Sequence, residues 1–434
     1  MPKSTELISL FEYDRINNDQ LMGELTSMYL KDEKWSKFLN VQKAYFKHYV
    51  GIVQTGSYRV SILPKIWKEN GQNQADAIKN LLRMLLYTYQ NTSFFNPETV
   101  ISPKYESNDL FELLILFYAI TLETQMNQGM YRRYVRMDDE SKYLRGKLNL
   151  ARHLNRIDKS SFDITDFRFS ADNRMNRYFA YATTLFSSFT QEKRSLDLLT
   201  AIELLFQSEG IPNHVLPGLV GFNRLNDRFQ IPYNYADLII KHMSPEPGNE
   251  RRAMMMLFDM NIVFQEFFVK FIKRNKSTIF SESYVNIESQ YSKKNFIFKE
   301  ASALRFTTPD LYIEVLGNGT TERFIIDMKY KIMKYTGIEE MEEGSDDDVF
   351  RITPSDLYQM FVYSDLHSAD HTLLLFPGSE NKISGPYKFK RDGPLLWICM
   401  LNLDLKENEW EKDLVKEFRE IFNKIKVSNP RKII

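Results

Sequence analysis

Residues 309–330 contain two extended apolar segments that are separated by Asn318-Gly319. The segments, 311–315 and 323–328, are rich in Ile, Val, Tyr and Phe, which favour β-strands. Asn-Gly is the strongest short signal for a tight turn between two strands. The sequence therefore predicts a β-hairpin, and any fold of the chain must contain it.

Charged side chains stand at the ends of this hairpin. Asp310 precedes the first strand, whereas Asp327 and Lys329 flank Met328 at the end of the second. Side chains two positions apart on a strand share a face, so Asp327 and Lys329 point the same way and Asp310 can face Asp327. Two carboxylates on one face suit Mg²⁺, and the lysine could deprotonate a water or stabilise charge on a phosphate group. The pattern indicates a magnesium nuclease; the alternative is an exposed hairpin with ordinary surface charges.

The composition restricts function only weakly. The 434 residues include 57 basic and 57 acidic side chains, so any contact with nucleic acid must come from a local patch. A hydrophobic content of 43% suffices for two or three domains. Cys399, the single cysteine, lies in an apolar run and is expected to be a buried strand residue in a reducing cytoplasm. No signal sequence or membrane span is expected.

Three ranges of the chain differ in pattern and are expected to be domains. They are a β-rich N-terminal region (1–70), a mixed helical domain (71–245) and a C-terminal domain (250–434). The stretch 244–250 contains two prolines and a glycine and is the clearest linker. In the first region 51–55 and 58–64 should form a hairpin, and in the second Asp109 should cap a helix that begins at Leu110.

The C-terminal domain has the element order of a restriction-endonuclease core. The expected elements are a long helix (252–274), the hairpin, an acidic loop (339–348), a helix (355–364), two strands (372–376 and 395–403) and a last helix (408–426). Helix, three strands, helix and strand is the order of that core. The acidic loop is expected to be solvated, with metal binding and repulsion of DNA as alternatives.

A basic block interrupts the helical domain. Strands are expected at 130–137, 143–150 and 162–169, with a charged turn at 138–140. Tyrosines are interleaved with basic residues in this block. The basic residues are Arg132, Arg133, Arg136, Lys142, Arg145, Lys147, Arg152 and Arg156, and the tyrosines are Tyr131, Tyr134 and Tyr143. This pattern fits contact with nucleic acid, contact with an acidic protein or a solvated hairpin face.

Several short passages, taken in order, carry a resemblance to a known family. They are Leu144-Arg-Gly-Lys-Leu-Asn-Leu150, Asn173-Arg-Met-Asn-Arg-Tyr178, Phe258-Asp-Met-Asn261, Phe264-Gln-Glu-Phe267, Pro309-Asp310, Asp327-Met-Lys-Tyr-Lys331, Ser355-Asp-Leu-Tyr-Gln-Met-Phe-Val-Tyr363 and Phe376-Pro377. In order and spacing, over about residues 75–425, the chain resembles the McrC family, the nuclease subunits of McrBC modification-dependent restriction systems.

The resemblance implies a multidomain architecture of the α+β and α/β classes. An N-terminal mixed β/helical partner-binding region would carry a β finger, and the C-terminal domain would be a PD-(D/E)XK restriction-endonuclease-like domain. The family's catalytic residues correspond to Asp310, Asp327 and Lys329, with one or two Mg²⁺ ions held by the two aspartates.

Three further residues are assigned by the resemblance as supporting residues. Gln265 lies at a position where the family often has Glu. Gln359 and Tyr363 are one helical turn apart and resemble the QxxxY element of RecB-like nucleases, which supports the active site or binds DNA.

The resemblance also implies a partner. In the family a finger enters the central pore of the McrB hexamer, a AAA+ GTPase, and stimulates its hydrolysis. The basic block, about 130–169, resembles this finger, and its candidate contact residues are Arg132, Arg133, Arg136, Arg145 and Lys147. The chain lacks a Gly-x-x-x-x-Gly-Lys-Ser/Thr loop, so it is expected to depend on the partner for GTP hydrolysis.

Three functions are compatible with these observations. The first is a Mg²⁺-dependent endonuclease subunit that cleaves methylcytosine-containing double-stranded DNA when it is assembled with the GTPase. The second is a GTPase-activating and assembly subunit with a vestigial nuclease site, an alternative that Gln265 leaves open. The third is a stand-alone RecB-like repair nuclease.

Two other groups of residues are not assigned to a site. His367 and His371 are spaced for one helical face, but they are expected to be ordinary polar histidines rather than metal ligands. The basic tail is expected to be a frayed terminus, with contact to DNA phosphates as the alternative. Its basic residues are Lys424, Lys426, Arg431 and Lys432.

Overall fold

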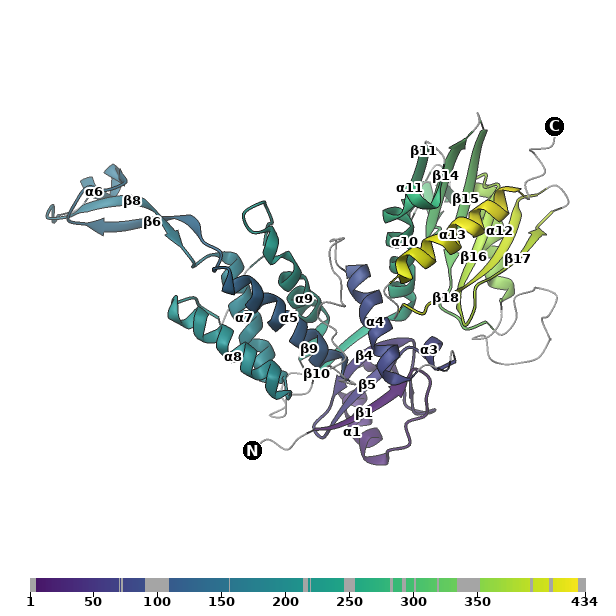
Figure 1. Cartoon of the computed structure of the whole chain (residues 1–434), viewed down its shortest axis with the longest axis horizontal. Coiled ribbons are helices and arrows are strands. Elements are labelled where there is room, and N and C mark those ends of the chain that lie inside the picture. The colour runs from purple at the N-terminus through teal and green to yellow at the C-terminus, as the bar shows by residue number, and fades with distance from the viewer. Residues whose placement is uncertain are drawn as a thin grey trace. The chain divides into compact units, whose positions relative to one another are not determined.

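The computed structural model describes residues 5–69, 71, 73–89, 109–155, 157–213, 218, 220–245, 254–281, 284–290, 294–299, 302–317, 320–333, 352–390, 393–405 and 409–427. The chain forms two compact units (Figure 1). The first comprises chiefly residues 109–252, and the second combines 5–91 with 253–434. This division differs from the expected ranges, because helix α4 (Gln74–Tyr89) packs on helix α10 (Met260–Arg274) within the second unit.

Helix α5 is the central helix of the first unit. Its first turns are buried on all sides, as a continuously apolar sequence requires. Asp109 accepts hydrogen bonds from backbone N–H groups of the first turn, which confirms the predicted cap. Helices α8 and α9 pack on α5, and α7 packs on α8. The elements of this helical part are α5 (Leu110–Asn127), α7 (Arg174–Phe189), α8 (Lys193–Ser208), the 3-10 helix η2 (Asp227–Phe229), α9 (Gln230–His242) and strand β9 (Met243–Pro245).

A small antiparallel sheet projects from these helices (Figure 1). Its elements, in sheet order, are β6 (Arg133–Ser141), β8 (Phe162–Ser170) and β7 (Lys147–Leu148), with helix α6 (Leu150–Leu154) packed on β8. We call residues 133–170 the finger.

The finger corrects two sequence predictions. The turn expected at 138–140 is part of strand β6, and the hydroxyl of Thr165 on β8 donates a hydrogen bond of 2.6 Å to Asp138. The acidic side chains thus have partners on another strand, which the local sequence does not reveal. The strand expected at 143–150 shortens to two residues, because Gly146 has a φ of +69° and helix α6 follows Asn149 directly.

The N-terminal part of the second unit is a sheet covered by helix α1 (Asp19–Lys31). Strands β4 and β5 form the predicted hairpin, β1 is parallel to β5, and β10 is antiparallel to β4. The region contains more helix than expected, because α1 buries Leu21 and Leu25 in one cluster with Val53 and Val60 of the sheet. The strands are β1 (Glu6–Phe11), β5 (Tyr58–Leu63), β4 (Tyr49–Gln54) and β10 (Met254–Asp259), and the smaller elements are α2 (Trp35–Phe38), β2 (Leu39–Asn40), β3 (Tyr45–Phe46) and α3 (Lys65–Glu69).

Strand β10 corrects the long helix expected at 252–274. Its side chains alternate between buried and partly buried, which is the period of a strand, and helix α10 begins only at Met260. Gly51 on β4 permits the close pairing: its φ is +132°, and a Cβ there would lie 2.1 Å from the carbonyl oxygen of Met256. Because β10 continues directly into α10, the N-terminal sheet fixes where that helix begins.

The C-terminal part of the second unit is built on a mixed sheet. The hairpin of β14 and β15 is antiparallel as predicted, although its turn residues, 318–319, lie outside the described residues. Strands β15, β16 and β18 are parallel neighbours. The strands, in sheet order, are β11 (Tyr284–Ser289), β14 (Leu311–Gly317), β15 (Thr320–Met328), β16 (His371–Gly378), β18 (Leu395–Asn402) and β17 (Lys382–Lys388), and a separate hairpin is formed by β12 (Lys294–Lys299) and β13 (Ser302–Thr307).

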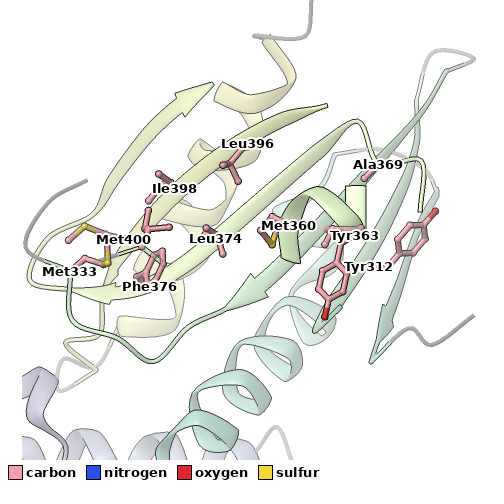
Figure 2. Packing of buried hydrophobic residues seen from close by; sticks show 12 residues of the cluster. Tyr312, Met333, Met360, Tyr363, Ala369, Leu374, Phe376, Leu396, Ile398 and Met400 are labelled. Atoms are coloured by element: carbon pink, nitrogen blue, oxygen red, sulfur yellow. The ribbon is translucent and has the colours of Figure 1, made fainter. Parts of the chain in front are cut away.

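Helix α12 (Pro354–Leu366) covers one face of this sheet. Met360 and Tyr363 of the helix join a buried cluster that includes Leu374 and Leu396 of the strands (Figure 2). The helix starts close to the predicted position, with Thr353 as its N-cap. This packing brings one side of α12 over the ends of the central strands.

The other face of the sheet is covered by α13 (Trp410–Val427), which also contacts α10 through the rings of Phe418 and Phe268. The ring of Phe422 on α13 lies 5.5 Å from that of Phe324 on β15. Ile325, the next residue of β15, belongs to the cluster on the α12 side. Because side chains alternate along a strand, Asp327 shares the α12 face with Ile325. The remaining helix is α11 (Lys276–Ile279).

Further sequence predictions concern Cys399, the basic tail, the linker and the acidic loop. Cys399 is fully buried on β18, as predicted. Lys424 and Lys426 lie in the last turn of α13 and not in a frayed tail. The linker from 246 onward, the acidic loop at 339–348 and the tail residues Arg431 and Lys432 are outside the described residues. Among the helices that the structure describes, none has the length and apolarity needed to cross a membrane.

Candidate active site

The two predicted carboxylates lie at the same end of the β14–β15 hairpin. Leu311 pairs with Ile326, so the next position along each strand places Asp310 beside Asp327. The backbone N–H of Met328 donates a hydrogen bond of 2.7 Å to one oxygen of Asp310. Asp327 is 2% exposed and Asp310 is partly buried, so neither carboxylate is fully hydrated.

The two carboxylates are electrostatically unfavourable neighbours. Burial, followed by the charge of Asp327, raises the pKa of Asp310 from 3.8 to about 7. Burial also raises the pKa of Asp327, although Lys329 opposes the increase. A site that disfavours two negative charges in this way gains stability from a bound cation.

Lys329 is held between the acid pair and helix α12. Its ammonium group lies 2.8 Å from Asp327 and donates a hydrogen bond of 2.8 Å to Oε1 of Gln359. Burial alone would lower the pKa of Lys329, but Asp327, Asp356 and Asp310 together raise it above the ordinary value. Lys329 is therefore a protonated hydrogen-bond donor in this arrangement.

The predicted Gln359–Tyr363 pair lies next to this lysine. The side-chain amide of Gln359 donates to the hydroxyl of Tyr363 at 2.8 Å, and this hydroxyl donates to the carbonyl oxygen of Thr308 at 3.2 Å. Thr308 stands two residues before Asp310. A chain of hydrogen bonds thus runs from Lys329 through α12 back to the strand that carries the first carboxylate.

Gln265 reaches the site from helix α10. Its Nε2 donates a hydrogen bond of 2.6 Å to Asp310, on the oxygen that Met328 does not contact. Its neighbour Glu266 lies near enough to contribute to the raised pKa of Asp310. The six residues predicted for the site are therefore brought together by α10, the β14–β15 hairpin and α12.

Asp356 is a site residue that the sequence prediction missed. It forms an ion pair of 2.8 Å with Lys331 and lies 3.9 Å from Lys329. It also forms a capping box with Thr353, the N-cap of α12. A threonine followed three residues later by an acid, around Pro354, is a recognisable helix start, so the signal was present in the sequence.

The donor atoms of this site suit a hard divalent cation. Asp310 and Asp327 offer carboxylate oxygens, and the Gln265 amide offers an oxygen if its group turns over. The part of the chain that the structure describes has no cluster of three or more His, Cys, Asp or Glu residues that could form a closed metal cage. Two carboxylates that leave room for waters and substrate fit Mg²⁺ best.

The two histidines set aside in the sequence are buried in the packing of the sheet. Nε2 of His367 lies 2.7 Å from the hydroxyl of Thr307, and His371 stacks on Phe324 with ring centroids 5.0 Å apart. Both are less than 5% exposed. They have the surroundings of structural histidines, but they do not share a helical face, because His367 is the C-cap of α12 and His371 begins strand β16.

The model of the family described as McrBC 5-methylcytosine restriction system component matches residues 44–377. This span includes the acid pair, Lys329 and the residues that hold them. The chain belongs to the McrBC family.

Two solved structures from McrBC systems resemble the chain. One is a refined half-complex from the tetradecameric assembly of Thermococcus gammatolerans McrB AAA+ hexamers with bound McrC, with 20% identity, a TM-score of 0.66, and coverage of 96% of this chain and 100% of that chain. The other is a Thermococcus gammatolerans McrBC complex, with 23% identity, a TM-score of 0.50, and coverage of 62% of this chain and 88% of that chain. At these identities the likeness concerns the fold. No curated protein matches the chain.

The McrBC family match also covers the finger, where the five predicted contact residues differ in availability. Three of them form ion pairs, namely Arg132 with Glu209 at 2.5 Å, Arg136 with Asp138 at 3.8 Å and Arg145 with Asp139 at 3.3 Å. Arg133 and Lys147 are exposed and form no ion pair with the residues described here. Of the five predicted contact residues, these two are therefore the most available to another molecule.

One face of the finger carries exposed aromatic side chains. Tyr134, Phe167 and Phe169 are 70%, 62% and 58% exposed. Tyr134 pairs with Phe169 across the strands, with ring centroids 5.3 Å apart. Phe167 lies two residues before Phe169 and shares its face. Exposed apolar surface of this kind is typical of a protein-binding site.

Proposed function

We propose that this member of the McrBC family is the McrC-type subunit, a Mg²⁺-dependent endonuclease that cleaves methylcytosine-containing double-stranded DNA together with a AAA+ GTPase hexamer. The observation that carries the proposal is the placement of Asp310 beside Asp327, with Lys329 held next to them by Gln359. In this interpretation the C-terminal part of the second unit is a PD-(D/E)XK domain.

Asp310 and Asp327 would hold the metal. When bound, Mg²⁺ supplies Lewis acidity toward a phosphate oxygen. The acid pair is suited to this role because a cation offsets the burial and the mutual repulsion that raise the pKa of Asp310. The amide of Gln265 fixes the orientation of Asp310 by donating to one of its oxygens.

Lys329 would stabilise the negative charge that builds on the phosphate during hydrolysis. Its raised pKa keeps it protonated, which favours this role over that of a general base. Gln359 accepts one of its hydrogens and Asp327 faces it, so the ammonium group has a fixed position before DNA arrives. Of the two roles compatible with the sequence, the structure supports charge stabilisation.

The finger is proposed to contact the GTPase. The related solved structure contains McrB AAA+ hexamers with bound McrC, and its likeness extends over 96% of this chain. The aromatic face around Tyr134 provides apolar contact area, and Arg133 and Lys147 provide charges that are free to pair with acidic groups. These features favour a protein partner over the two other readings of the basic block.

A second candidate function is a non-cleaving assembly subunit. Gln265 favours it, because with this neutral amide beside Asp310 the site has one negative charge fewer than it would have with a glutamate. Such a subunit would stimulate GTP hydrolysis but would not need Mg²⁺ at Asp310 and Asp327.

The two functions are separated by a cleavage assay with the AAA+ partner, GTP and plasmid DNA that is methylated or unmethylated. For the nuclease we expect Mg²⁺-dependent cutting of methylated plasmid, its loss in Asp327→Asn and unchanged stimulation of GTPase. Asp365→Asn, which alters an exposed acid of α12, is the matched control. Stimulation of GTPase without cutting by the unaltered chain would establish the assembly subunit instead. Cutting without the partner or GTP would indicate a stand-alone nuclease.

A further inference from the structure

A buried acid of the N-terminal region reaches the neighbourhood of the candidate active site. Glu12 follows strand β1 and is 2% exposed. One of its oxygens accepts a hydrogen bond of 3.1 Å from the backbone N–H of Lys65 and another from the hydroxyl of Tyr330. The side chain of Lys65 lies over the rings of Tyr13 and Tyr330, at 4.3 Å and 5.4 Å from their centroids. Burial of a carboxylate is costly, so these bonds define the conformation strongly.

Tyr330 lies between two parts of the candidate site. It directly follows Lys329 in the chain and is 4% exposed. Its ring centroid lies 5.9 Å from that of Phe264, the residue before Gln265 on α10. A displacement of Tyr330 would therefore also shift Lys329 and helix α10, which carries Gln265.

The backbone around Tyr330 has little support from the sheet. Strand β15 ends at Met328. Beyond it, the N–H of Lys329 still bonds to the carbonyl oxygen of Leu375 at 2.9 Å, whereas the N–H of Lys331 bonds, among the described residues, to the carbonyl oxygen of Lys329 and not to the sheet. The segment 329–331 is therefore positioned mainly by its side chains, and the buried anchor among them is Tyr330.

We propose that Glu12 is a positioning residue of the candidate active site, which fixes Lys329 by holding the hydroxyl of Tyr330. The inference rests on the proposed nuclease function, and it makes the N-terminal sheet a part of the catalytic unit. Glu12 contacts neither the acid pair nor Lys329, so its effect passes through the backbone of 329–331.

The geometry of the bonds, rather than the charge of Glu12, carries this role. The Oε1 atom accepts both hydrogen bonds, while Oε2 is buried and has no hydrogen-bond partner among the described residues. A glutamine can present the same acceptor to Lys65 and Tyr330. A leucine of similar size cannot, and the hydroxyl of Tyr330 is then left buried without an acceptor.

The test compares four variants of the full chain. Glu12→Leu removes the acceptor, Tyr330→Phe removes only the hydroxyl, and Glu12→Gln retains the acceptor. The control is Gln54→Leu, which removes the buried acceptor of Arg59 at the opposite end of the same sheet. Amide hydrogen exchange of residues 329–331 is measured without DNA or metal. Cleavage is measured in single turnover with partner, GTP, methylated plasmid and saturating Mg²⁺.

Glu12→Leu and Tyr330→Phe are expected to raise exchange at 329–331 and to lower the cleavage rate about tenfold to a hundredfold. Glu12→Gln should keep the exchange at 329–331 and the cleavage rate at the values of the unaltered chain. Gln54→Leu should lower thermal stability without changing either quantity. Unchanged exchange in Tyr330→Phe, or raised exchange with an unaltered cleavage rate, would overturn the proposal. So would a Gln54→Leu chain that behaves like Glu12→Leu. If the unaltered chain cuts no DNA, the nuclease function itself is wrong, whereas the exchange data still report on the anchor.

Discussion

The side-chain amide of Gln265 donates a hydrogen bond of 2.6 Å to the carboxylate of Asp310. The bond joins helix α10 to the segment that carries Asp310, and in the proposed nuclease a glutamate at position 265 would add a third carboxylate beside the acid pair. Gln265→Glu is therefore expected to add a ligand and to tighten Mg²⁺ binding about tenfold, which corresponds to about 1.4 kcal/mol. Calorimetric titration with Mg²⁺ measures this change. Asn261→Asp, an exposed substitution on the same helix, is the control, and equal affinities in all three chains would contradict the prediction.

The hydrogen bond from Lys329 to Gln359 leads to a second prediction. Gln359→Leu removes the acceptor of the ammonium group and the donor to Tyr363. Loss of such a supporting residue is expected to lower the cleavage rate about tenfold to a hundredfold, with unchanged stimulation of the partner's GTPase. Tyr358→Leu, one position earlier and 71% exposed, should leave the rate unchanged. Equal rates for both variants would show that Gln359 does not support the lysine.

The contacts of Asp356 indicate that its replacement lowers the free energy of unfolding. Burial raises its pKa, but its hydrogen bonds to Lys331 and Thr353 lower the pKa below the ordinary value, so the residue is charged in the folded chain. Asp356→Ala removes the capping box and leaves Lys331 without its partner, and should lower the free energy of unfolding by about 1–3 kcal/mol. Urea unfolding measures the loss. Asp365→Ala, an exposed acid near the other end of α12, should change stability by less than about 0.5 kcal/mol.

Glu12 should give the stability of the chain a distinct pH dependence. Burial, opposed by Lys65 and Tyr330, raises the pKa of Glu12 from 4.5 to about 7, and Asp259 adds slightly to the increase. The folded chain therefore binds a proton that the unfolded chain releases. The contribution to stability is complete below pH 4.5, is lost as the pH rises to about 7 and does not change further above it.

The glutamine variant isolates this effect. Glu12→Gln cannot titrate, so relative to the unaltered chain it should gain up to about 3 kcal/mol between pH 5 and pH 8. Urea unfolding of both chains at several pH values gives the difference. A difference that is constant with pH would contradict the prediction.

The finger is expected to act on the GTPase through Arg133 and Lys147, which are exposed and form no ion pair with the residues that the structure describes. Replacement of Arg133 and Lys147 together by alanine should reduce stimulation of the partner's GTP hydrolysis at least about tenfold, because their charges are available for pairing with an acidic surface. The thermal stability of the chain should not change. Lys193→Ala, an exposed lysine at the start of α8, is the control. Normal stimulation by the double variant would place the contact elsewhere.

The candidate site could be predicted from the sequence because its parts follow local rules. Two apolar segments around Asn-Gly predict a hairpin, and the observed register of β14 and β15 brings Asp310 beside Asp327. Gln359 and Tyr363 are one helical turn apart, so their bond follows from helix geometry. Their meeting with Lys329 required the family resemblance, because no local pattern shows which face of the sheet α12 covers.

The errors occurred where a distant partner decides the local structure. Met254 to Asp259 is apolar enough to begin a long helix, but it is a strand because β4 pairs with it from about 200 residues earlier in the chain. Asp138 and Asp139 suggest a turn until β8 supplies Thr165 and Arg168. No sequence pattern indicated a role for Glu12, because its proposed role depends on a hydrogen bond with Tyr330, which is remote in sequence.

The pairing of β4 with β10 has a consequence for synthesis of the protein. A ribosome makes β4 and β5 early, then nearly all of the first unit, and only afterwards strand β10, the partner of β4. During this interval the edge of β4 that later pairs with β10 has no partner strand. Nascent chains with such an exposed edge are prone to associate. Tyr330 emerges later still, and Gln359 and Tyr363 follow it, so the proposed nuclease site cannot assemble before about the first 363 residues have been translated.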